Sequence, residues 1–139
     1  GPCIIGEGSE IRHCAFIRGS ALIGKGCVVG NSTELKNCIL FDKTQVPHYN
    51  YVGDSILGKG SHLGASSVIS NLKSDGKDVC VNIDGERVST HRRKFGAILG
   101  DGADIGCGSE PRKHHRKGKP HISTQHNKRN RSVGMHIQN

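Results

Sequence analysis

The chain has 139 residues, enough for one domain, with an aromatic content of only 4% and a formal net charge of +8. No apolar run approaches the roughly 18 residues of a membrane span, and no signal-peptide pattern opens the chain, so we expect a soluble, cytoplasmic protein without a membrane partner. Residues 1–109 hold 12 Lys and Arg against 11 Asp and Glu, whereas residues 110–139 hold 8 against 1. The basic charge therefore belongs to the end of the chain, and we expect no nucleic-acid partner for the rest.

An apolar side chain returns at every sixth position from the start of the chain. A period of six matches neither the helix period of about 3.6 nor the strand period of 2, and it is typical of short flat strands coiled into a prism. Glycine often follows these positions, and we expect it to form the corners because it enters left-handed backbone conformations freely. The first inward positions are Ile5, Ile11, Ile17, Ile23, Val29 and Leu35.

The phase of this ladder slips by one residue after Leu35 and again before Leu57. Three hexads make one coil, and coils of this kind usually wind left-handed, an exception to the right-handed crossover rule. The sequence therefore predicts an all-β, left-handed parallel β-helix over residues 1–109. The later inward positions are Leu40, Val46, Val52, Leu57, Leu63, Ile69, Leu99 and Ile105.

A long excursion over residues 70–96 interrupts the hexads. Its segment VCVNIDGERV predicts a hairpin that turns at Asp84 and Gly85. Loops that leave a repeat scaffold commonly build binding sites. The basic cluster 91–94 (HRRK) could bind phosphate or an acidic neighbour, and a solvated charge run is an equal alternative.

The basic tail, residues 110–139, has neither the period of six nor the glycine corners. One interpretation is a native nucleic-acid-binding tail. The interpretation we favour is a shifted reading frame, because codons from Ser109 onward, read one base later, can encode IGKGSHI, which resembles GKGSHLG at 58–64. As written, the tail is expected to be disordered and unable to cap the prism. The chain also begins inside the ladder without Met, so we expect a fragment whose N-terminal part is missing, unless Gly1 and Pro2 are a protease scar.

The six cysteines lie far apart and form no C-x-x-C pair, so the sequence supports neither a zinc knuckle nor a redox motif. A prism has a core of its own and does not require disulfides. We expect reduced, structural thiols at Cys3, Cys14, Cys27, Cys38, Cys80 and Cys107.

The densest polar segment runs from residue 46 to residue 71. His48 lies two residues after an inward position and therefore near a corner. A lone histidine at such a place is usually structural. With Tyr51 three residues on and Asn71 about one coil later, however, stacking can bring the three side chains together on one edge.

Four motifs occur in one register without a gap: FIRG around Arg18, ELKN around Lys36, PHYNYVGD with His48 and Tyr51, and SNL with Asn71. In these motifs the chain resembles the C-terminal left-handed β-helix (hexapeptide-repeat) domain of bifunctional sugar-1-phosphate nucleotidylyltransferase/N-acetyltransferases. This is the UDP-N-acetylglucosamine pyrophosphorylase/glucosamine-1-phosphate N-acetyltransferase family. The resemblance covers roughly residues 1 to 109.

The resemblance implies acetyl transfer from acetyl-CoA to the amino group of a hexosamine 1-phosphate, in a pathway that serves the cell envelope. It implies a longer chain whose nucleotidylyltransferase domain, the only part that would need Mg²⁺, makes the nucleotide sugar. It also implies a homotrimer with sites between chains. The fragment by itself is expected to have weak or no activity, because an uncapped final coil leaves a strand edge exposed and the acetyl-CoA site incomplete.

The resemblance also assigns roles to seven residues. His48 matches the catalytic base, which accepts a proton from the attacking amine, and Asn71 matches the asparagine beside the substrate. Sugar-phosphate ligands are Arg18, Lys36 and Tyr51; the two cations lie one coil apart at 18 residues and suit a dianionic phosphate. The acetyl-CoA site is assigned to Ala65, through its backbone, and to Cys107 in the final coils.

Some positions depart from the family pattern. Ser66 follows Gly64 and Ala65 where relatives have G-A-G, His62 replaces an asparagine, and Leu72 replaces a tyrosine. His91 stands where relatives more often have glycine. The identity of the amino sugar is therefore left open.

Two other functions are compatible with the fold. One is a non-catalytic prism that serves oligomerisation or regulation behind a nucleotidylyltransferase domain. The other is a zinc enzyme of the γ-carbonic anhydrase type, which would need three histidine ligands at a subunit boundary. The histidines of residues 1–109 lack a close ligand pair, so no metal site is predicted; they are His13, His48, His62 and His91.

Overall fold

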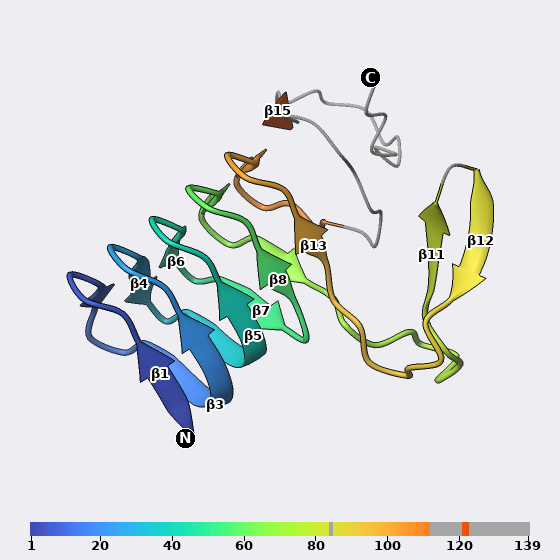
Figure 1. Cartoon of the computed structure of the whole chain (residues 1–139), viewed down its shortest axis with the longest axis horizontal. Coiled ribbons are helices and arrows are strands. Elements are labelled where there is room, and N and C mark those ends of the chain that lie inside the picture. Colours follow the sequence, from blue (N-terminus) through green and yellow to red (C-terminus); the bar gives the residue numbers. More distant parts are fainter. Residues whose placement is uncertain (84, 112–120, 123–139) are drawn as a thin grey trace.

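The computed structural model describes residues 1–83, 85–111 and 121–122, and within them every regular element is a β-strand. Short strands follow one another around three flat faces, and the coils stack side by side along the long axis of the molecule (Figure 1). The strands of neighbouring coils pair in parallel. The predicted parallel β-helix is confirmed.

Each face collects one strand segment from every coil. The first face holds β1 (Cys3–Ile5), the last parts of β3 (Phe16–Ile23) and β5 (Glu34–Leu40), β8 (Ile56–Leu57) and β13 (Ile98–Leu99). The second face holds β2 (Glu10–Ile11), β4 (Val28–Asn31), β6 (Gln45–His48), β9 (His62–Leu63), β14 (Asp104–Ile105) and β15 (His121–Ile122). The third face holds the first parts of β3 and β5, β7 (Tyr51–Gly53) and β10 (Val68–Ile69).

The inward residues predicted from the period of six lie opposite one another in successive coils. On the first face the paired residues are Ile5, Ile23, Leu40, Leu57 and Leu99. On the third face they are Ile17, Leu35, Val52 and Ile69, and on the second face Val29 pairs with Ile11 and Val46, and Leu63 with Ile105. Most of these side chains are fully buried, so the ladder is the core of the protein.

The phase slip in the ladder has a local cause in β3. Ile17 pairs with Leu35, 18 positions later, but Gly19 pairs with Lys36, 17 positions later. Arg18 is therefore the extra residue of a β-bulge, and coils after it are one residue shorter at this corner. The slip that follows Leu35 in the sequence is the loss of this bulge from later coils.

The glycines that follow inward residues serve close packing between coils. We expected them to supply left-handed conformations, but Gly30 is not among the residues with positive φ. A Cβ there would lie 1.5 Å from the Pro47 carbonyl oxygen of the next coil. The left-handed conformation falls two residues later, at Ser32, where φ is 53°. The expectation about the conformation of these glycines was therefore wrong, and the space between coils is what excludes a side chain.

The excursion 70–96 carries the predicted hairpin. Strands β11 (Cys80–Ile83) and β12 (Glu86–Ser89) pair antiparallel and stand off the stack of coils (Figure 1). The chain then rejoins the stack at the corner between the third and first faces, where the Gly96 N–H donates to the Asp54 carbonyl. Leu57 thus pairs with Leu99, 42 positions later, so the whole excursion enters and leaves within a single coil.

The prediction of a disordered tail lies largely outside the described residues. Of residues 110–139 only 110, 111, 121 and 122 are described, and the last two form β15, which pairs in parallel with β14. In the described part of the chain no helix is long and apolar enough to cross a membrane. The six cysteines are free; Cys27 and Cys38 are buried.

The buried ladder makes a prediction about stability. Leu35 is fully buried, whereas Leu22, on the outer side of the first face, is 46% exposed. We expect Leu35→Ala to lower the free energy of unfolding by about 2–5 kcal/mol, because it removes buried methyl groups and leaves a cavity. The matched variant Leu22→Ala should cost about 1 kcal/mol or less. Urea unfolding followed by circular dichroism measures both; equal losses would contradict the assignment of inward and outward positions.

A second prediction concerns alkaline pH. Burial raises the pKa of Cys38 from 9.0 to about 12. A raised pKa in the folded state means that the thiol contributes its full stability below pH 9 and loses it as the pH rises from 9 toward 12. The stability advantage of the wild type over Cys38→Ala should therefore shrink by up to about 1.4 kcal/mol per pH unit across that range. Urea unfolding at pH 8, 9.5 and 10.5 tests this, and parallel losses in both proteins would refute it.

Candidate active site

The seven residues singled out from the sequence fall into two groups, one at a corner of the third face and one on that face. The corner group lies between the second and third faces and consists of His48, Ala65 and Cys107. The face group lies on the third face and at its corner with the first face, and consists of Arg18, Lys36, Tyr51 and Asn71.

The corner group owes its arrangement to a turn that recurs in successive coils. The turn residue after each member has a left-handed conformation, with φ of 52° at Tyr49, 60° at Ser66 and 65° at Gly108. The Ser66 N–H donates to the His48 carbonyl at 3.0 Å, and the Gly108 N–H donates to the Ala65 carbonyl at 2.8 Å. His48, Ala65 and Cys107 are therefore equivalent residues of three adjacent coils. Earlier coils place His13 and Asn31 at the same position.

A buried asparagine fixes the corner that carries His48. The Asn50 side chain is only 2% exposed. Its Oδ1 accepts a hydrogen bond from the His48 N–H at 3.1 Å, and its Nδ2 donates to the Gly64 carbonyl at 2.8 Å. Asn50 thus links the turn of one coil to the turn of the next. We did not identify Asn50 from the sequence. The pattern that could have indicated it is a polar residue at the same corner position in neighbouring coils, where Thr33 and Ser67 are also buried.

The corner group leaves two functional groups free. The His48 side chain is exposed, and its imidazole makes no hydrogen bond to the described part of the chain. The Ala65 N–H likewise has no acceptor among residues 1–83, 85–111 and 121–122, whereas the next two N–H groups donate to the carbonyls of His48 and Gly64. A basic nitrogen and an unused backbone donor on adjacent coils are what a base and an oxyanion donor require.

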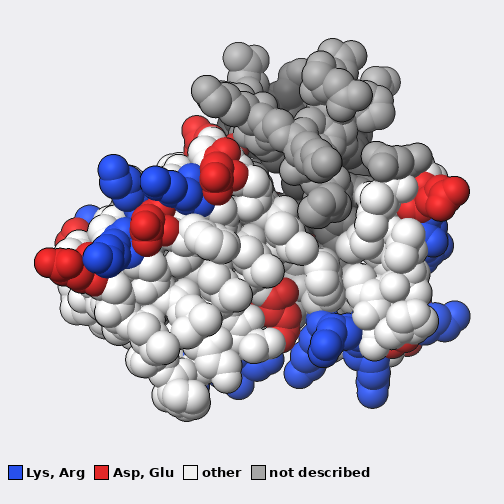
Figure 2. Space-filling view, viewed as in Figure 1, with Lys and Arg blue, Asp and Glu red and all other residues white. Residues whose placement is uncertain are grey.

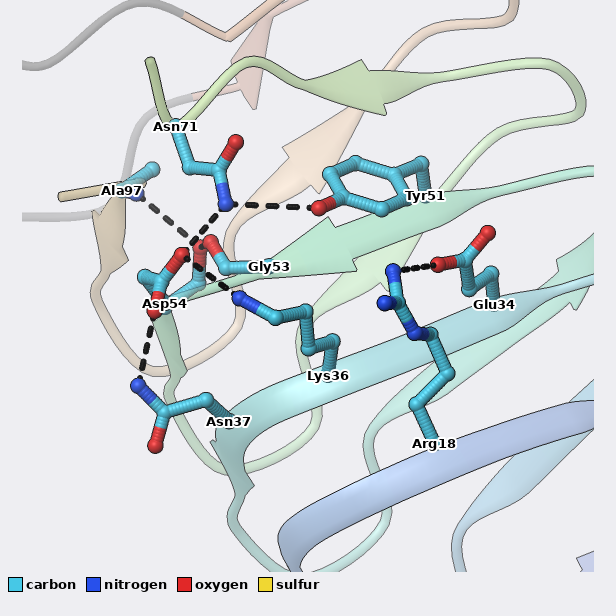
Figure 3. Close-up of polar contacts among 10 residues, drawn as sticks. Arg18, Glu34, Lys36, Asn37, Tyr51, Gly53, Asp54, Asn71 and Ala97 are labelled. Atoms are coloured by element: carbon cyan, nitrogen blue, oxygen red, sulfur yellow. Dashed lines mark hydrogen bonds and ion pairs between the residues drawn. The ribbon is translucent and has the colours of Figure 1, made fainter. Parts of the chain in front are cut away.

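The face group contains two cations, and each contacts its own carboxylate (Figure 3). The Arg18 Nη1 lies 2.9 Å from Glu34 Oε1. The Lys36 Nζ lies 3.7 Å from Asp54 Oδ2, and both of these side chains are largely buried, at 26% and 11% exposed. The two cations are offset rather than opposite, because Lys36 pairs with Gly19 and Arg18 occupies the bulge.

Asp54 connects the face group, and the sequence-based prediction gave it no role. Its Oδ1 accepts from Asn37 Nδ2 at 2.7 Å, and its Oδ2 accepts from Asn71 Nδ2 (Figure 3). Asn71 Nδ2 also donates to the Tyr51 hydroxyl at 3.3 Å. In the sequence, Asp54 has only the signature of a polar corner residue, because its partners come from the coils before and after its own.

Gly53 makes room for these contacts. A Cβ at this position would lie 2.6 Å from the Tyr51 hydroxyl oxygen and 2.7 Å from Asn71 Nδ2. Both side chains therefore lie over the bare backbone of Gly53. The predicted meeting of His48, Tyr51 and Asn71 is thus found for Tyr51 and Asn71, while within the described residues no hydrogen bond or ion pair joins His48 to either.

The basic loop 91–94 lines a groove that contains none of the seven predicted residues. Figure 2 shows Lys and Arg side chains gathered where the hairpin meets the stack of coils. The apolar side of this groove comes from Leu22, Ile39, Ile56 and Ile98 of the first face, and the basic side from Arg92, Arg93 and Lys94. Arg93 is held in place by its Nε, which donates to the Gly76 carbonyl at 3.1 Å.

The histidines of the ladder lie apart. His13 and His48 occupy the corner two coils from each other, and His62 lies on the second face, where its Nδ1 is 2.9 Å from Asp104 Oδ1. His91 belongs to the excursion. Among the residues that the structure describes, no three His, Cys, Asp or Glu side chains come together in a group that could hold a metal ion.

Comparison with known proteins finds curated relatives that match part of this chain. Among curated relatives, the bifunctional protein GlmU of Methanococcus maripaludis (strain C5) is 44% identical over 92 residues, which cover 66% of this chain and 22% of the relative. GlmU of Methanococcus aeolicus is 41% identical over 124 residues, and this match covers 76% of this chain and 30% of the relative. The bifunctional sugar-1-phosphate nucleotidylyltransferase/acetyltransferase of Sulfurisphaera tokodaii is 39% identical over 86 residues, which cover 62% of this chain and 21% of the relative.

The chain spans less than a third of the length of each of these relatives. Residues 1–107, which include the stacked coils and all seven predicted residues, match the family described as the GMPPB C-terminal domain. This match covers more than half of the 139 residues. The chain belongs to the GMPPB C-terminal domain family.

Proposed function

We propose that this domain transfers the acetyl group of acetyl-CoA to the amino group of a hexosamine 1-phosphate. The observation that carries the proposal is the corner where the free imidazole of His48 and the free N–H of Ala65 lie on adjacent coils. The names of the relatives support the same class of reaction, since they are bifunctional proteins and one is a sugar-1-phosphate nucleotidylyltransferase/acetyltransferase.

His48 acts as the general base. The amine must be neutral to attack the thioester carbon, and a neutral imidazole accepts the proton that the nitrogen loses as the new C–N bond forms. The Ala65 N–H donates to the carbonyl oxygen while it carries negative charge. When the C–S bond breaks, the thiolate of coenzyme A leaves and the protonated imidazole can return the proton to it. Cys107, one coil further, borders the same corner and would contact the acetyl-CoA chain.

The face group binds the sugar phosphate. Arg18 offers a planar fork of N–H donors and Lys36 a point charge, the two kinds of cation that suit a phosphate dianion. Their present partners, Glu34 and Asp54, are carboxylates, so each cation already contacts an anionic oxygen at this place. A phosphate would compete with those carboxylates, and Tyr51 adds a hydroxyl to the same group.

The first face supports the proposal of a homotrimer. Its outward residues form a continuous aliphatic stripe across successive coils: Ile4, Leu22, Ile39, Ile56 and Ile98. Ile4 is 67% exposed and Leu22 is 46% exposed, whereas Ile39, Ile56 and Ile98 are partly buried. Apolar surface that is left exposed marks places that other proteins cover. In a trimer, a neighbouring subunit would complete the acetyl-CoA site beside the corner group.

Nucleotide transfer and its Mg²⁺ would belong to a separate domain, in the part of the relatives' length that this chain does not match. A cytoplasmic location remains a prediction.

The same stripe favours one other function, a non-catalytic prism that assembles subunits. Both cations of the face group are neutralised within the chain, as in an ordinary structural surface. The two functions differ in what they require of His48, because assembly needs no free imidazole at the corner.

The proposal predicts a specific loss in one variant. His48→Ala should lower the rate of thiol release from acetyl-CoA by about 10²- to 10⁴-fold, since it removes the base. His13→Ala is the matched control, because His13 holds the same corner position two coils away and should leave the rate unchanged. Thiol release is measured with glucosamine 1-phosphate and with galactosamine 1-phosphate. The ratio between variants is the readout, because the sequence predicts a low rate for the chain by itself.

Two outcomes would contradict the proposal. If His48→Ala releases thiol at the wild-type rate, then His48 is not the base. If the unsubstituted chain neither releases thiol nor binds a sugar 1-phosphate in calorimetry, the assembly function is favoured instead.

A further inference from the structure

The Asp54 carboxylate is surrounded by hydrogen-bond donors. Asn37 Nδ2 lies 2.7 Å from its Oδ1, while Asn71 Nδ2 and the Lys36 ammonium both contact its Oδ2 (Figure 3). Its side chain is 11% exposed. Hydrogen bonds to a carboxylate are roughly twice as strong as those between neutral groups, so Asp54 is the strongest acceptor available to its neighbours.

This carboxylate determines which end of the Asn71 amide faces outward. An amide nitrogen carries two N–H donors, and those of Asn71 go to Asp54 and to the Tyr51 hydroxyl. The Asn71 oxygen is therefore directed away from both partners, as Figure 3 shows. Without the carboxylate, the amide could turn over and present its N–H groups instead.

The same chain of contacts sets the direction of the Tyr51 hydroxyl. Its oxygen accepts from Asn71, so its own proton is available to another acceptor. The result is one outward acceptor at Asn71 and one available donor at Tyr51. These two groups match the two polar parts of an amino-sugar 1-phosphate: N–H groups that need an acceptor and phosphate oxygens that need a donor.

We propose that Asp54 is a positioning residue that makes Asn71 a hydrogen-bond acceptor for the substituent at carbon 2 of the sugar. This inference rests on the proposed function. An acceptor that holds an N–H of the amine leaves the nitrogen lone pair free to attack. A turned amide would donate to that lone pair and block it. Asp54 therefore favours the orientation in which the amine can react.

The test compares two sugars that differ only in this hydrogen bond. Glucose 1-phosphate has an O–H donor at carbon 2, whereas 2-deoxy-2-fluoroglucose 1-phosphate has none. Calorimetry should show that wild-type protein binds the first sugar about two- to tenfold more tightly. Asp54→Asn is nearly isosteric and suits the left-handed conformation at this position, where φ is 49°. It should reduce the preference below twofold, because the amide at 71 is then free to turn.

Two further variants separate positioning from folding. Asn37→Ala removes another partner of the same carboxylate and should keep the preference. The double variant Asp54→Asn/Asn71→Asp places the carboxylate at position 71, where it can only accept, and should restore the preference. A purely structural role of Asp54 predicts no such recovery. Thermal unfolding of each variant checks that the stack of coils is intact.

The outcomes distinguish the two proposals. If wild-type protein binds neither sugar, the proposed function fails and the inference falls with it. If it binds both sugars equally, or if Asp54→Asn binds them with the wild-type preference, only the role of Asp54 is overturned. If Asp54→Asn and the double variant both lose all binding while the wild type shows the preference, Asp54 is structural and the inference is wrong.

Discussion

Parallel pairing between successive coils is the constraint on which the rest of this structure depends. Each coil pairs most of its backbone N–H and C=O groups with its neighbours, so equivalent residues must lie one strand spacing apart, about 4.8 Å. With no helix in the described residues, this stacking also supplies the core, because each inward side chain packs on its equivalents in the coils before and after it. A side chain that faces outward inherits the same spacing. Residues 17 or 18 positions apart in the chain become direct neighbours.

That spacing explains why functional groups gather in columns. The corner group is a column of equivalent turn residues, and Asn50 secures it by bonding the turn of its own coil to the turn of the next. The face group is held together differently, by Asp54, whose partners come from the two coils on either side of its own. The two cations of the face group form ion pairs with carboxylates of the same chain, whereas the imidazole of His48 has no partner in the described residues. The two groups therefore differ in what they offer: the face group holds paired charges, and the corner group holds an imidazole with no partner in the described residues.

The excursion illustrates how a repeat scaffold accommodates an insertion. Leu57 and Leu99 pair directly although 42 positions separate them, because the chain leaves and rejoins the stack at one corner. The rejoining strand is anchored by backbone bonds, such as that from Gly96 to Asp54. The loop thereby brings Arg92 and Lys94 beside the aliphatic stripe of the first face without disturbing the core. Insertion at a corner costs the stack no strand pairing, since the strands on either side keep their register.

Much of the fold could be predicted because its core residues recur at a regular interval along the sequence. Ile17, Leu35, Val52 and Ile69 were recognisable by period alone, and the hairpin by its alternating residues and turn. The site was predicted less completely. His48, Tyr51 and Asn71 could be assigned roles from motifs. Asn50 and Asp54 lie in the same motif as His48 but received no role, since a polar corner residue has the same appearance whether it faces solvent or binds three partners.

The sequence by itself therefore determined the coil, its inward residues and the insertion, because burial demands apolar side chains at a fixed period. Only the tertiary structure decided that the extra residue at Arg18 is a bulge, that the glycines after inward positions serve close packing between coils, and that Tyr51 and Asn71 meet over Gly53 while His48 lies on another corner. These features depend on distances between coils. A period along the chain states which residues are equivalent, but not how their side chains meet.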